Sequence, residues 1–445
     1  MPLTEVRSSA DLGTLGWMWH SQDRLEAAWS RQPCQLLMCV LKRPIISKEE
    51  GKADVSHAEL KCSPRVRDQL PCNIGRQAMS YSDLKPLHQQ VVVITGASSG
   101  IGLVTARIAA RAGAGVLLAS RNEDALRTIT AELQANGAQA AYVVADVSKR
   151  EDHKRIARTA IERFGGFDSW VNNASVGTAG ELNKVTLEDH RQVFEVNYWG
   201  VVYGSLEAAT YLRRRGGAII NIGSVLGERT VVLQGPYCAA KHAVRAFTTG
   251  LRVELEREGA PISVTHIKPS SIDTPFPEHA RNYLRTGIQV PQPVYSPTLV
   301  AKAILFACQT PRRELTVGFG GKMAPLMGRL FPRLTDRLME AVGYWAQETS
   351  NPGIPARRDN LYGPREDGAE RSSLGYPIVL KSSPYLQAQM HPAATAAILG
   401  GLAVGLAVAT RARREGGNPR ELLRPPFPLR LNGEGASGPR FPGKR

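Results

Sequence analysis

The chain has 445 residues, too many for one ordinary domain, and 42% of them are hydrophobic, which excludes a wholly disordered protein. The formal charge of +16 comes from 56 Lys and Arg against 40 Asp and Glu, and the excess is densest in residues 351–445. Because no basic run is interleaved with aromatic residues, a nucleic-acid partner is not expected. The six cysteines match neither a secreted disulfide framework nor a zinc site, so we expect reduced thiols and no metal.

Residues 1–78 show no sustained apolar periodicity and no signal-peptide pattern. Met79 then opens a polar stretch that leads directly into the strand-like run VVVITG at 91–96. We predict that 1–78 is a poorly ordered extension, whose place in the native protein stays open. The folded domain is predicted to begin at Met79.

Seven apolar runs alternate with helix-length segments in the next part of the chain. Their Val, Ile and Leu content is typical of strands buried on both faces. The alternation predicts an α/β catalytic domain over 79–325, built on a Rossmann-type, doubly wound, seven-stranded parallel sheet. The predicted strands are 91–95, 115–120, 140–146, 168–174, 217–224, 262–269 and 314–319.

The C-terminal part divides into four segments. Residues 326–348 are predicted to form an amphipathic helical appendage, and 349–392, rich in Pro, Gly, Ser and charged residues, a linker. Residues 393–410 carry no charge over 18 positions, which meets the lower limit for a transmembrane helix, although seven are Ala and three are Gly. The alternative, a buried Ala-rich helix, has no neighbouring domain to cover it. Residues 411–445 are predicted to form a basic, Pro-rich, disordered tail.

A glycine-rich turn stands between the first predicted strand and a helix, the context in which such a turn binds phosphates. It reads Thr95-Gly96-Ala97-Ser98-Ser99-Gly100-Ile101-Gly102. Gly96 permits a positive φ, Gly100 lets the backbone approach a pyrophosphate, and Gly102 lets the helix pack against the strand. The helix N-terminus adds N–H groups and a positive dipole end. We therefore predict a dinucleotide site at this turn.

The end of the second predicted strand indicates which dinucleotide is bound. An NAD site usually places an acidic residue there for the ribose 2′-hydroxyl, whereas this chain has Ser120 and Arg121. A guanidinium can pair with a 2′-phosphate through charge-assisted hydrogen bonds. NADP(H) is therefore predicted in preference to NAD(H). The alternative for Arg121 is an ordinary surface residue at the start of a helix.

Three residues further along have the chemistry of a proton-transfer site. Tyr237 and Lys241 stand four apart on a predicted helix, so they share a face, and a nearby ammonium lowers a tyrosine pKa. Ser224 ends the run INIGS, where its hydroxyl can hydrogen-bond a substrate oxygen. Hydride transfer to a carbonyl needs such a proton donor. Taken singly, each residue also has an ordinary structural explanation.

The motifs TGASSGIG, VNNAS, EVNYWG, YCAAK and PSSIDT, with Ser224, occur in the order and spacing of the short-chain dehydrogenase/reductase family. The chain resembles this family over about residues 88–320, as a bacterial-type member with a C-terminal extension. The resemblance implies that Tyr237 is the general acid/base and that Ser224 positions the carbonyl. It implies that Lys241 tunes Tyr237 and binds the nicotinamide ribose, and that Asn197 holds a water in the proton relay. Further cofactor contacts are implied for Asp146, Val147, Asn173, Ala174, Pro269 and Thr274, and family members commonly form homo-oligomers.

Two positions depart from the family pattern. Gly is usual where Ser175 and Ser270 stand. A serine there narrows the available backbone angles and crowds the cofactor. We expect altered cofactor affinity with the chemistry intact.

The leading hypothesis is an NADP(H)-dependent oxidoreductase that interconverts an alcohol and a ketone or aldehyde. The alternative is a membrane-tethered NADP(H)-binding sensor or scaffold without turnover. An epimerase or dehydratase would need a different glycine pattern and a larger C-terminal substrate domain. Apolar residues within 270–300, such as Phe276 and Ile288, favour a lipophilic substrate.

The apolar C-terminal segment also governs the expected location. NADP(H) chemistry favours a catalytic domain in the cytoplasm with the segment in the membrane; a soluble cytoplasmic protein is the alternative. Arg411, Arg413 and Arg414 follow the segment, and the positive-inside tendency would keep them cytoplasmic. The two indications conflict, and we place the catalytic domain in the cytoplasm because the need for NADP(H) outweighs the statistical positive-inside tendency.

Overall fold

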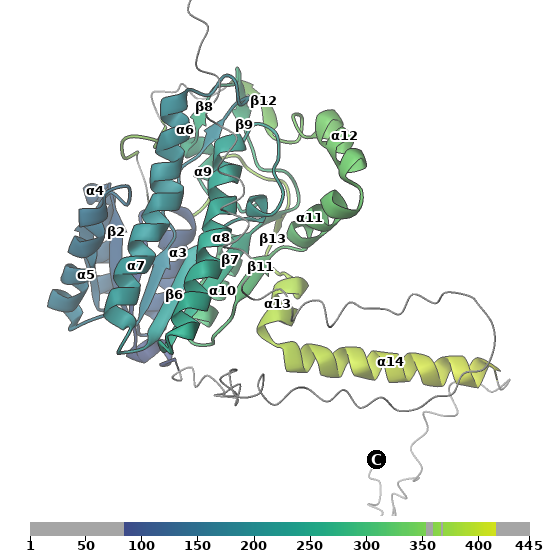
Figure 1. Ribbon diagram of the computed structural model, residues 1–445, viewed down its shortest axis with the longest axis horizontal. Helices are drawn as coiled ribbons and strands as arrows, with labels where there is room; N and C mark the ends of the chain where they lie inside the picture. The colour runs from purple at the N-terminus through teal and green to yellow at the C-terminus, as the bar shows by residue number, and fades with distance from the viewer. Residues whose placement is uncertain (1–83, 353–358, 366–367, 415–445) are drawn as a thin grey trace, which may run out of the picture. The chain divides into compact units, whose positions relative to one another are not determined.

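A computed structural model describes residues 84–352, 359–365 and 368–414 of the chain (Figure 1). The predicted N-terminal extension, residues 1–78, lies outside the described residues. Of the predicted disordered tail, residues 411–445, the part from 415 onward also lies outside the described residues, whereas 411–414 continue the C-terminal helix and are not disordered.

A seven-stranded sheet forms the centre of the catalytic domain, with strand order β11-β7-β6-β4-β1-β2-β3 and all neighbours parallel. This confirms the predicted doubly wound sheet. All seven runs give strands that match the predicted ranges or lie within them, and four of the strands, β3, β4, β6 and β11, end two residues before the predicted end. The strands are β1 (Val91–Thr95), β2 (Gly115–Ser120), β3 (Ala140–Val144), β4 (Ser169–Asn172), β6 (Gly217–Ile222), β7 (Ile262–Pro269) and β11 (Glu314–Val317).

Helices cover both faces of the sheet (Figure 1). Successive strand residues point to opposite faces, so Ile94 and Leu118 belong to one core and Val93 and Leu117 to the other. The first core is closed by α3 (Gly100–Arg111), α4 (Glu123–Ala135) and α10 (Pro297–Ala307). The second is closed by α5 (Arg150–Phe164), α7 (Gly200–Leu212) and α8 (Gly235–Arg257). Apolar side chains on both faces are the reason that the strand runs are continuously hydrophobic.

Shorter elements gather around the connections that leave the sheet. Strand β5 pairs in parallel with β8, which lies within residues 270–300, the part of the chain whose apolar residues favour a lipophilic substrate. These elements are η1 (Leu87–Gln89), β5 (Thr178–Ala179), α6 (Leu187–Phe194), the π-helical turn η2 (Glu195–Trp199), η3 (Val225–Gly227), α9 (Phe276–His279), β8 (Arg281–Asn282), β9 (Thr286–Ile288) and β10 (Val294–Tyr295).

The C-terminal segments contain α11 (Gly320–Leu330), α12 (Pro332–Val342), β12 (Glu348–Pro352), β13 (Val379–Leu380), α13 (Pro384–Met390) and α14 (Pro392–Arg414). The composition of 349–392 predicts a linker, but β12 pairs with β9 and β13 pairs with β10. Leu361 and Leu386 are fully buried. A few apolar anchors and backbone pairings therefore fix a segment whose overall composition is polar.

The parallel strands end at one edge of the sheet, where the connections to the helices lie. The order changes direction at β1, since β2 lies on one side of it and β4 on the other. Open α/β sheets bind ligands outside the carboxyl ends of the strands at such a switch point. The residues predicted to bind a cofactor follow these strand ends.

Candidate active site

The turn between β1 and α3 has the form that its glycines require. Gly96 adopts a φ of 63°, a left-handed conformation that residues with a side chain rarely adopt. A Cβ on Gly102 would stand 2.2 Å from the carbonyl oxygen of Gly96, so only glycine lets the helix come this close. The N-terminus of α3 therefore opens beside the end of β1, where it can receive phosphates.

Thr95 and Asn173 hold this turn against the end of β4. The Nδ2 of Asn173 donates to the carbonyl oxygens of Thr95 and Gly96, at 2.9 Å and 3.1 Å. The Oγ1 of Thr95 accepts from the backbone N–H of Asn173 at 3.0 Å and donates to the carbonyl oxygen of Val171 at 3.3 Å. These bonds link two neighbouring strand ends, so the turn has little freedom to move.

A cavity of about 260 Å³ runs along the carboxyl edge of the sheet. It brings together most of the residues predicted from the sequence. Its walls include Gly96, Ser98, Ser99, Gly100, Ile101, Ser120, Arg121, Asp146, Val147, Asn173, Ala174, Ser224, Tyr237, Lys241, Pro269 and Thr274. Thr95, Gly102 and Asn197 lie behind the wall and support it.

Ser224, Tyr237 and Lys241 meet in this cavity. Ser224 follows β6, where its Oγ accepts a hydrogen bond from the N–H of Leu226 at 3.1 Å, and it also hydrogen-bonds the side chain of Tyr237. Tyr237 and Lys241 lie one turn apart on α8, with Nζ of Lys241 5.5 Å from the centroid of the tyrosine ring. That Nζ donates to the carbonyl oxygen of Ile222 at 2.9 Å. The three side chains therefore form one connected group.

Burial controls the charge of this group. It raises the pKa of the Tyr237 hydroxyl well above the usual value, which the hydrogen bond with Ser224 offsets only in part. It also lowers the pKa of Lys241 to about 7. Burial thus dominates the pKa of both groups, because desolvation disfavours the charged form of each. The tyrosine keeps its proton at neutral pH.

Asn197 lies in the π-helical turn between α6 and α7 and is fully buried. Its Oδ1 accepts from the N–H of Val176 at 2.9 Å and from the Oγ of Ser175 at 3.1 Å, and its Nδ2 donates to the carbonyl oxygen of Val176 at 2.8 Å. Single π turns inside helices are frequent at functional sites. Here the turn directs an amide into the connection that follows β4.

Ser175 and Ser270, where glycine is usual, line the cavity. Among the described residues the one non-glycine residue with a positive φ is Leu233. The two serines therefore occupy ordinary backbone conformations, and the expected narrowing of backbone angles causes no strain. Any effect on a cofactor comes from the added hydroxyl groups.

Phe276, expected from the sequence to favour a lipophilic substrate, lines the cavity with its ring tilted by 55° against that of Tyr237 and the ring centroids 5.3 Å apart. The sequence prediction missed other parts of the wall, among them His279, Val290 and Gln347. Three more wall residues, Asn360, Pro364 and Arg365, come from the predicted linker. No local motif marks these positions, because the chain brings them to the cavity through tertiary contacts.

The residues present fit a dinucleotide. A glycine turn at a helix N-terminus suits the pyrophosphate, and the polar ends of β2 and β3 suit an adenosine. No group of three or more metal-binding side chains occurs in the part of the chain that the structure describes. Cys238 and Cys308 are buried free thiols.

The seven-stranded sheet, the glycine turn and the cavity beside it define a Rossmann-type nucleotide-binding oxidoreductase.

The sequence comparisons name the family. A profile of the short chain dehydrogenase family matches residues 90–284. The uncharacterized oxidoreductase YxnA of Bacillus subtilis is 47% identical over 337 residues, which are 74% of this chain and 93% of that protein. A 1-deoxy-11-beta-hydroxypentalenate dehydrogenase of Streptomyces exfoliatus is 42% identical over 43% of this chain and 70% of its own length. The chain belongs to the short-chain dehydrogenase/reductase family.

A solved structure agrees with this assignment. A short chain dehydrogenase/reductase from Burkholderia phymatum, in complex with NAD, matches with a TM-score of 0.51 and 27% identity. The match covers 56% of this chain and 96% of that chain. The seven-stranded fold is therefore that of the family, and the C-terminal segments extend beyond it.

Proposed function

We propose that this protein is an NADP(H)-dependent oxidoreductase that interconverts an alcohol and a ketone or aldehyde. The observation that carries the proposal is the connected group of Ser224, Tyr237 and Lys241 in the wall of the cavity that begins at the glycine turn. A proton donor and a phosphate cradle in one cavity are what carbonyl reduction by a nicotinamide requires.

Each residue has a defined part in the proposed reaction. When bound, the nicotinamide coenzyme supplies the hydride. The hydroxyl of Tyr237, which burial keeps protonated, gives its proton to the substrate oxygen. Ser224 hydrogen-bonds the same oxygen and orients the carbonyl. Lys241 lies against Tyr237. Asn197 holds Val176, a residue of the cavity wall, in position.

NADP(H) is preferred over NAD(H) in this proposal. Arg121 follows β2 and lines the cavity together with Ser120 and Asn122, and none of these three is acidic. A carboxylate there would hold a ribose 2′-hydroxyl and repel a 2′-phosphate. A guanidinium pairs with the phosphate instead.

A lipophilic substrate fits the end of the cavity near Tyr237. Phe276, Val225, Leu226 and Val290 form that end, and the first of these packs on the tyrosine ring. Apolar walls with a few polar groups near the reacting atom are typical of sites for apolar ligands.

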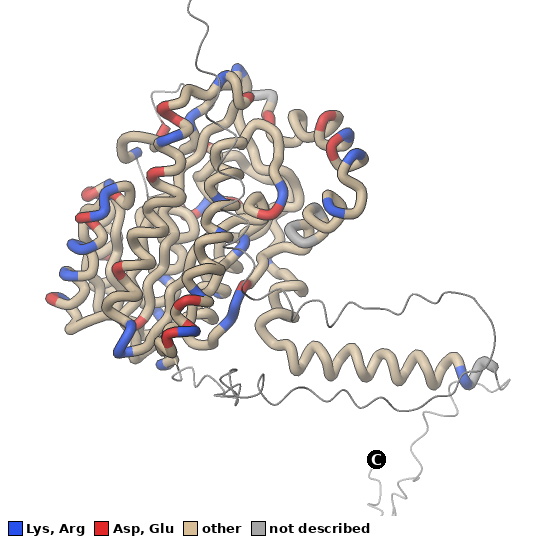
Figure 2. The backbone as a smooth tube through the Cα atoms, in the orientation of Figure 1, with Lys and Arg blue, Asp and Glu red and all other residues tan. Residues whose placement is uncertain are grey.

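We further propose that α14 anchors the protein in a membrane, with the catalytic domain on the cytoplasmic side. Over Pro392–Arg411 its mean hydropathy is 1.9, and no part of that window is buried. Figure 2 shows no charged residue along the helix until Arg411 near its end. An apolar helix of this length with no protein cover suits a bilayer.

A coenzyme-oxidation assay tests the reaction. Purified full-length protein is titrated with NADPH and with NADH, then mixed with a panel of apolar and short polar ketones and aldehydes. We expect tighter NADPH binding and turnover of apolar carbonyls. The Tyr237→Phe variant should bind NADPH as the parent does and lose at least about a hundredfold in kcat, because the proton donor is gone. A protein that binds neither coenzyme, or a variant with unchanged kcat, would contradict the proposal.

A further inference from the structure

The segment 359–365 lies outside residues 90–284, which match the family profile, yet it reaches the cavity. Asn360, Pro364 and Arg365 line the same cavity as the glycine turn and the end of β2. The catalytic domain alone therefore does not enclose this cavity. The C-terminal extension completes it.

Backbone contacts join the segment to the two residues that follow β2. The Nη2 of Arg121 donates to the carbonyl oxygen of Asn360, and the Nδ2 of Asn122 donates to the carbonyl oxygen of Arg365 at 2.7 Å. These are the residues that lie beside the adenosine ribose in a Rossmann-type site. The segment thus meets the catalytic domain where NADP and NAD differ.

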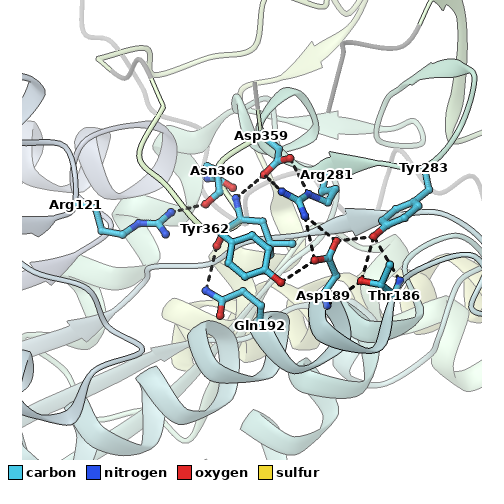
Figure 3. Close-up of polar contacts among 10 residues, drawn as sticks. Arg121, Thr186, Asp189, Gln192, Arg281, Tyr283, Asp359, Asn360 and Tyr362 are labelled. Atoms are coloured by element: carbon cyan, nitrogen blue, oxygen red, sulfur yellow. Dashed lines mark hydrogen bonds and ion pairs between the residues drawn. The ribbon is translucent and has the colours of Figure 1, made fainter. Parts of the chain in front are cut away.

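A cluster of four side chains, two from the segment and two from the catalytic domain, holds the segment in place (Figure 3). We call Asp189, Arg281, Asp359 and Tyr362 the clasp. Arg281 pairs with Asp359 at 2.8 Å and with Asp189 at 3.1 Å, and the hydroxyl of Tyr362 donates to Asp189 at 2.8 Å. The guanidinium of Arg281 also lies over the Tyr362 ring, 5.0 Å from its centroid.

The clasp is strong because its carboxylates are nearly buried. The side chains of Asp189 and Asp359 are 3% and 5% exposed, so solvent screens their pairing with Arg281 only weakly. Leu361, between Asp359 and Tyr362, is fully buried in a cluster with Val147 and Val196. None of the four clasp residues lines the cavity.

Two further observations place the extension at the predicted coenzyme site. Within the described residues, the Oδ1 of Asn360 is buried and has no hydrogen-bond partner, although an acceptor in such a place normally has one. Residues 368–370 reach α3: the N–H of Gly100 in the glycine turn donates to the carbonyl oxygen of Ala369 at 2.9 Å and is therefore engaged by the extension, and Arg107, further along α3, pairs with Glu370 at 2.8 Å. The extension therefore contacts both ends of the adenosine diphosphate part of the predicted site.

We propose that the 359–365 segment forms the outer wall of the adenosine site, where Asn360 accepts a hydrogen bond from the adenosine. Arg365, whose Nη1 donates to the carbonyl oxygen of Glu278 in α9, is in this proposal a second cation for the 2′-phosphate through its remaining N–H groups. The clasp residues act as positioning residues that keep this wall in place. This inference rests on the proposed NADP(H) function. It assigns part of the coenzyme preference to a segment beyond the family domain.

The proposed role of Arg365 is tested by calorimetric titration of the full-length protein with NADPH and with NADH, which gives the Kd for each coenzyme. Arg365→Gln should raise the Kd for NADPH about tenfold and change the Kd for NADH less than about twofold, because a charge-assisted bond to a phosphate is lost. Arg365→Lys should recover part of the preference. Arg337→Gln, which removes an exposed arginine of α12, is the matched control and should leave both Kd values unchanged.

The clasp is tested by Tyr362→Phe, which removes the bond to Asp189 and keeps the ring over Arg281. We expect the Kd for NADPH to rise about threefold or more, since one hydrogen bond to a charged group is lost. Tyr283→Phe removes another donor to the same carboxylate, 2.6 Å from its Oδ2, without touching the segment, and should leave NADPH binding unchanged. Thermal unfolding of each variant, run in parallel, shows that the variants are folded.

The outcomes separate the two proposals. If the parent protein binds NADPH but Arg365→Gln keeps the parental ratio of NADPH to NADH affinity, the inference about the wall is overturned and the proposed function stands. An unchanged NADPH Kd in Tyr362→Phe overturns the role of the clasp. If the parent protein binds neither coenzyme, the proposed function itself fails, and the wall fails with it.

Discussion

The charge of Lys241 depends strongly on its surroundings. Its side chain is 1% exposed, and burial lowers its pKa to about 7 from the ordinary value of 10.5. The unfolded chain therefore binds more protons than the folded chain between these two values. The stability that Lys241 contributes is present above about pH 10.5 and is lost as the pH falls through about 7.

Urea unfolding of the parent and of Lys241→Met at pH 7 and pH 9 measures this effect. We expect the difference in free energy of unfolding, parent minus variant, to grow by about 1–3 kcal/mol between the two pH values. Lys302→Met, at an exposed position, controls for the loss of one lysine. A difference that stays constant with pH would mean that the buried ammonium is not destabilised as proposed.

Gly102 is the second residue with a clear prediction. A Cβ at position 102 would lie 2.2 Å from the carbonyl oxygen of Gly96, and the hydrogen-bonded turn cannot move away without losing its contacts. Gly102→Ala should lower the free energy of unfolding by about 1–3 kcal/mol and weaken NADPH binding, since the turn must shift. Gly250→Ala in α8, where nothing lies within 4 Å, should instead stabilise by about 0.5–1 kcal/mol. Equal stability of the two variants would contradict the close approach.

At the scale of elements, the strands were the most predictable part of the protein. Each of the seven predicted runs contains a strand of the sheet, because burial on both faces demands an unbroken apolar run. Their ends were less predictable. The predicted strand 168–174 is only Ser169–Asn172, since Asn173 and Ala174 leave the ladder to hold the glycine turn.

The π-helical turn between α6 and α7 is an element that the sequence did not indicate. Asn197 sits in it and satisfies both backbone groups of Val176, which is 2% exposed. Asn197→Ala should lower the free energy of unfolding by about 1–3 kcal/mol for each backbone group left unsatisfied. Denaturant unfolding measures it, with the exposed Asn136→Ala at the end of α4 as the control. Similar losses in both variants would argue against this bracing role.

At the scale of the whole molecule, α14 is expected to decide where the protein resides. A charge at the centre of a membrane span costs about 2.5–3.5 kcal/mol on insertion scales. Val404→Arg in the full-length chain should therefore move protein from the membrane fraction to the soluble fraction. Thr410→Arg, beside Arg411 at the end of the span, should leave the distribution unchanged. Oxidoreductase activity per molecule should be the same in both variants, and a parent protein that is already soluble would refute the anchor.

The fold class, the family and the candidate group of Ser224, Tyr237 and Lys241 could all be predicted from the amino-acid sequence. Strand runs and local motifs record short-range requirements, such as a glycine where backbone meets backbone or a helical spacing between a phenol and an amine. These requirements are visible without knowledge of distant contacts.

The enclosure of the cavity and the pKa values of its buried groups depend instead on tertiary contacts. Asn360 and Arg365 stand in a stretch whose composition predicts a linker, and they reach the cavity because Leu361 is buried and Arg281 binds Asp359. The high pKa of Tyr237 likewise follows from burial, which no local spacing reveals. Both depend on contacts between residues far apart in the chain, so no window of the sequence contains them.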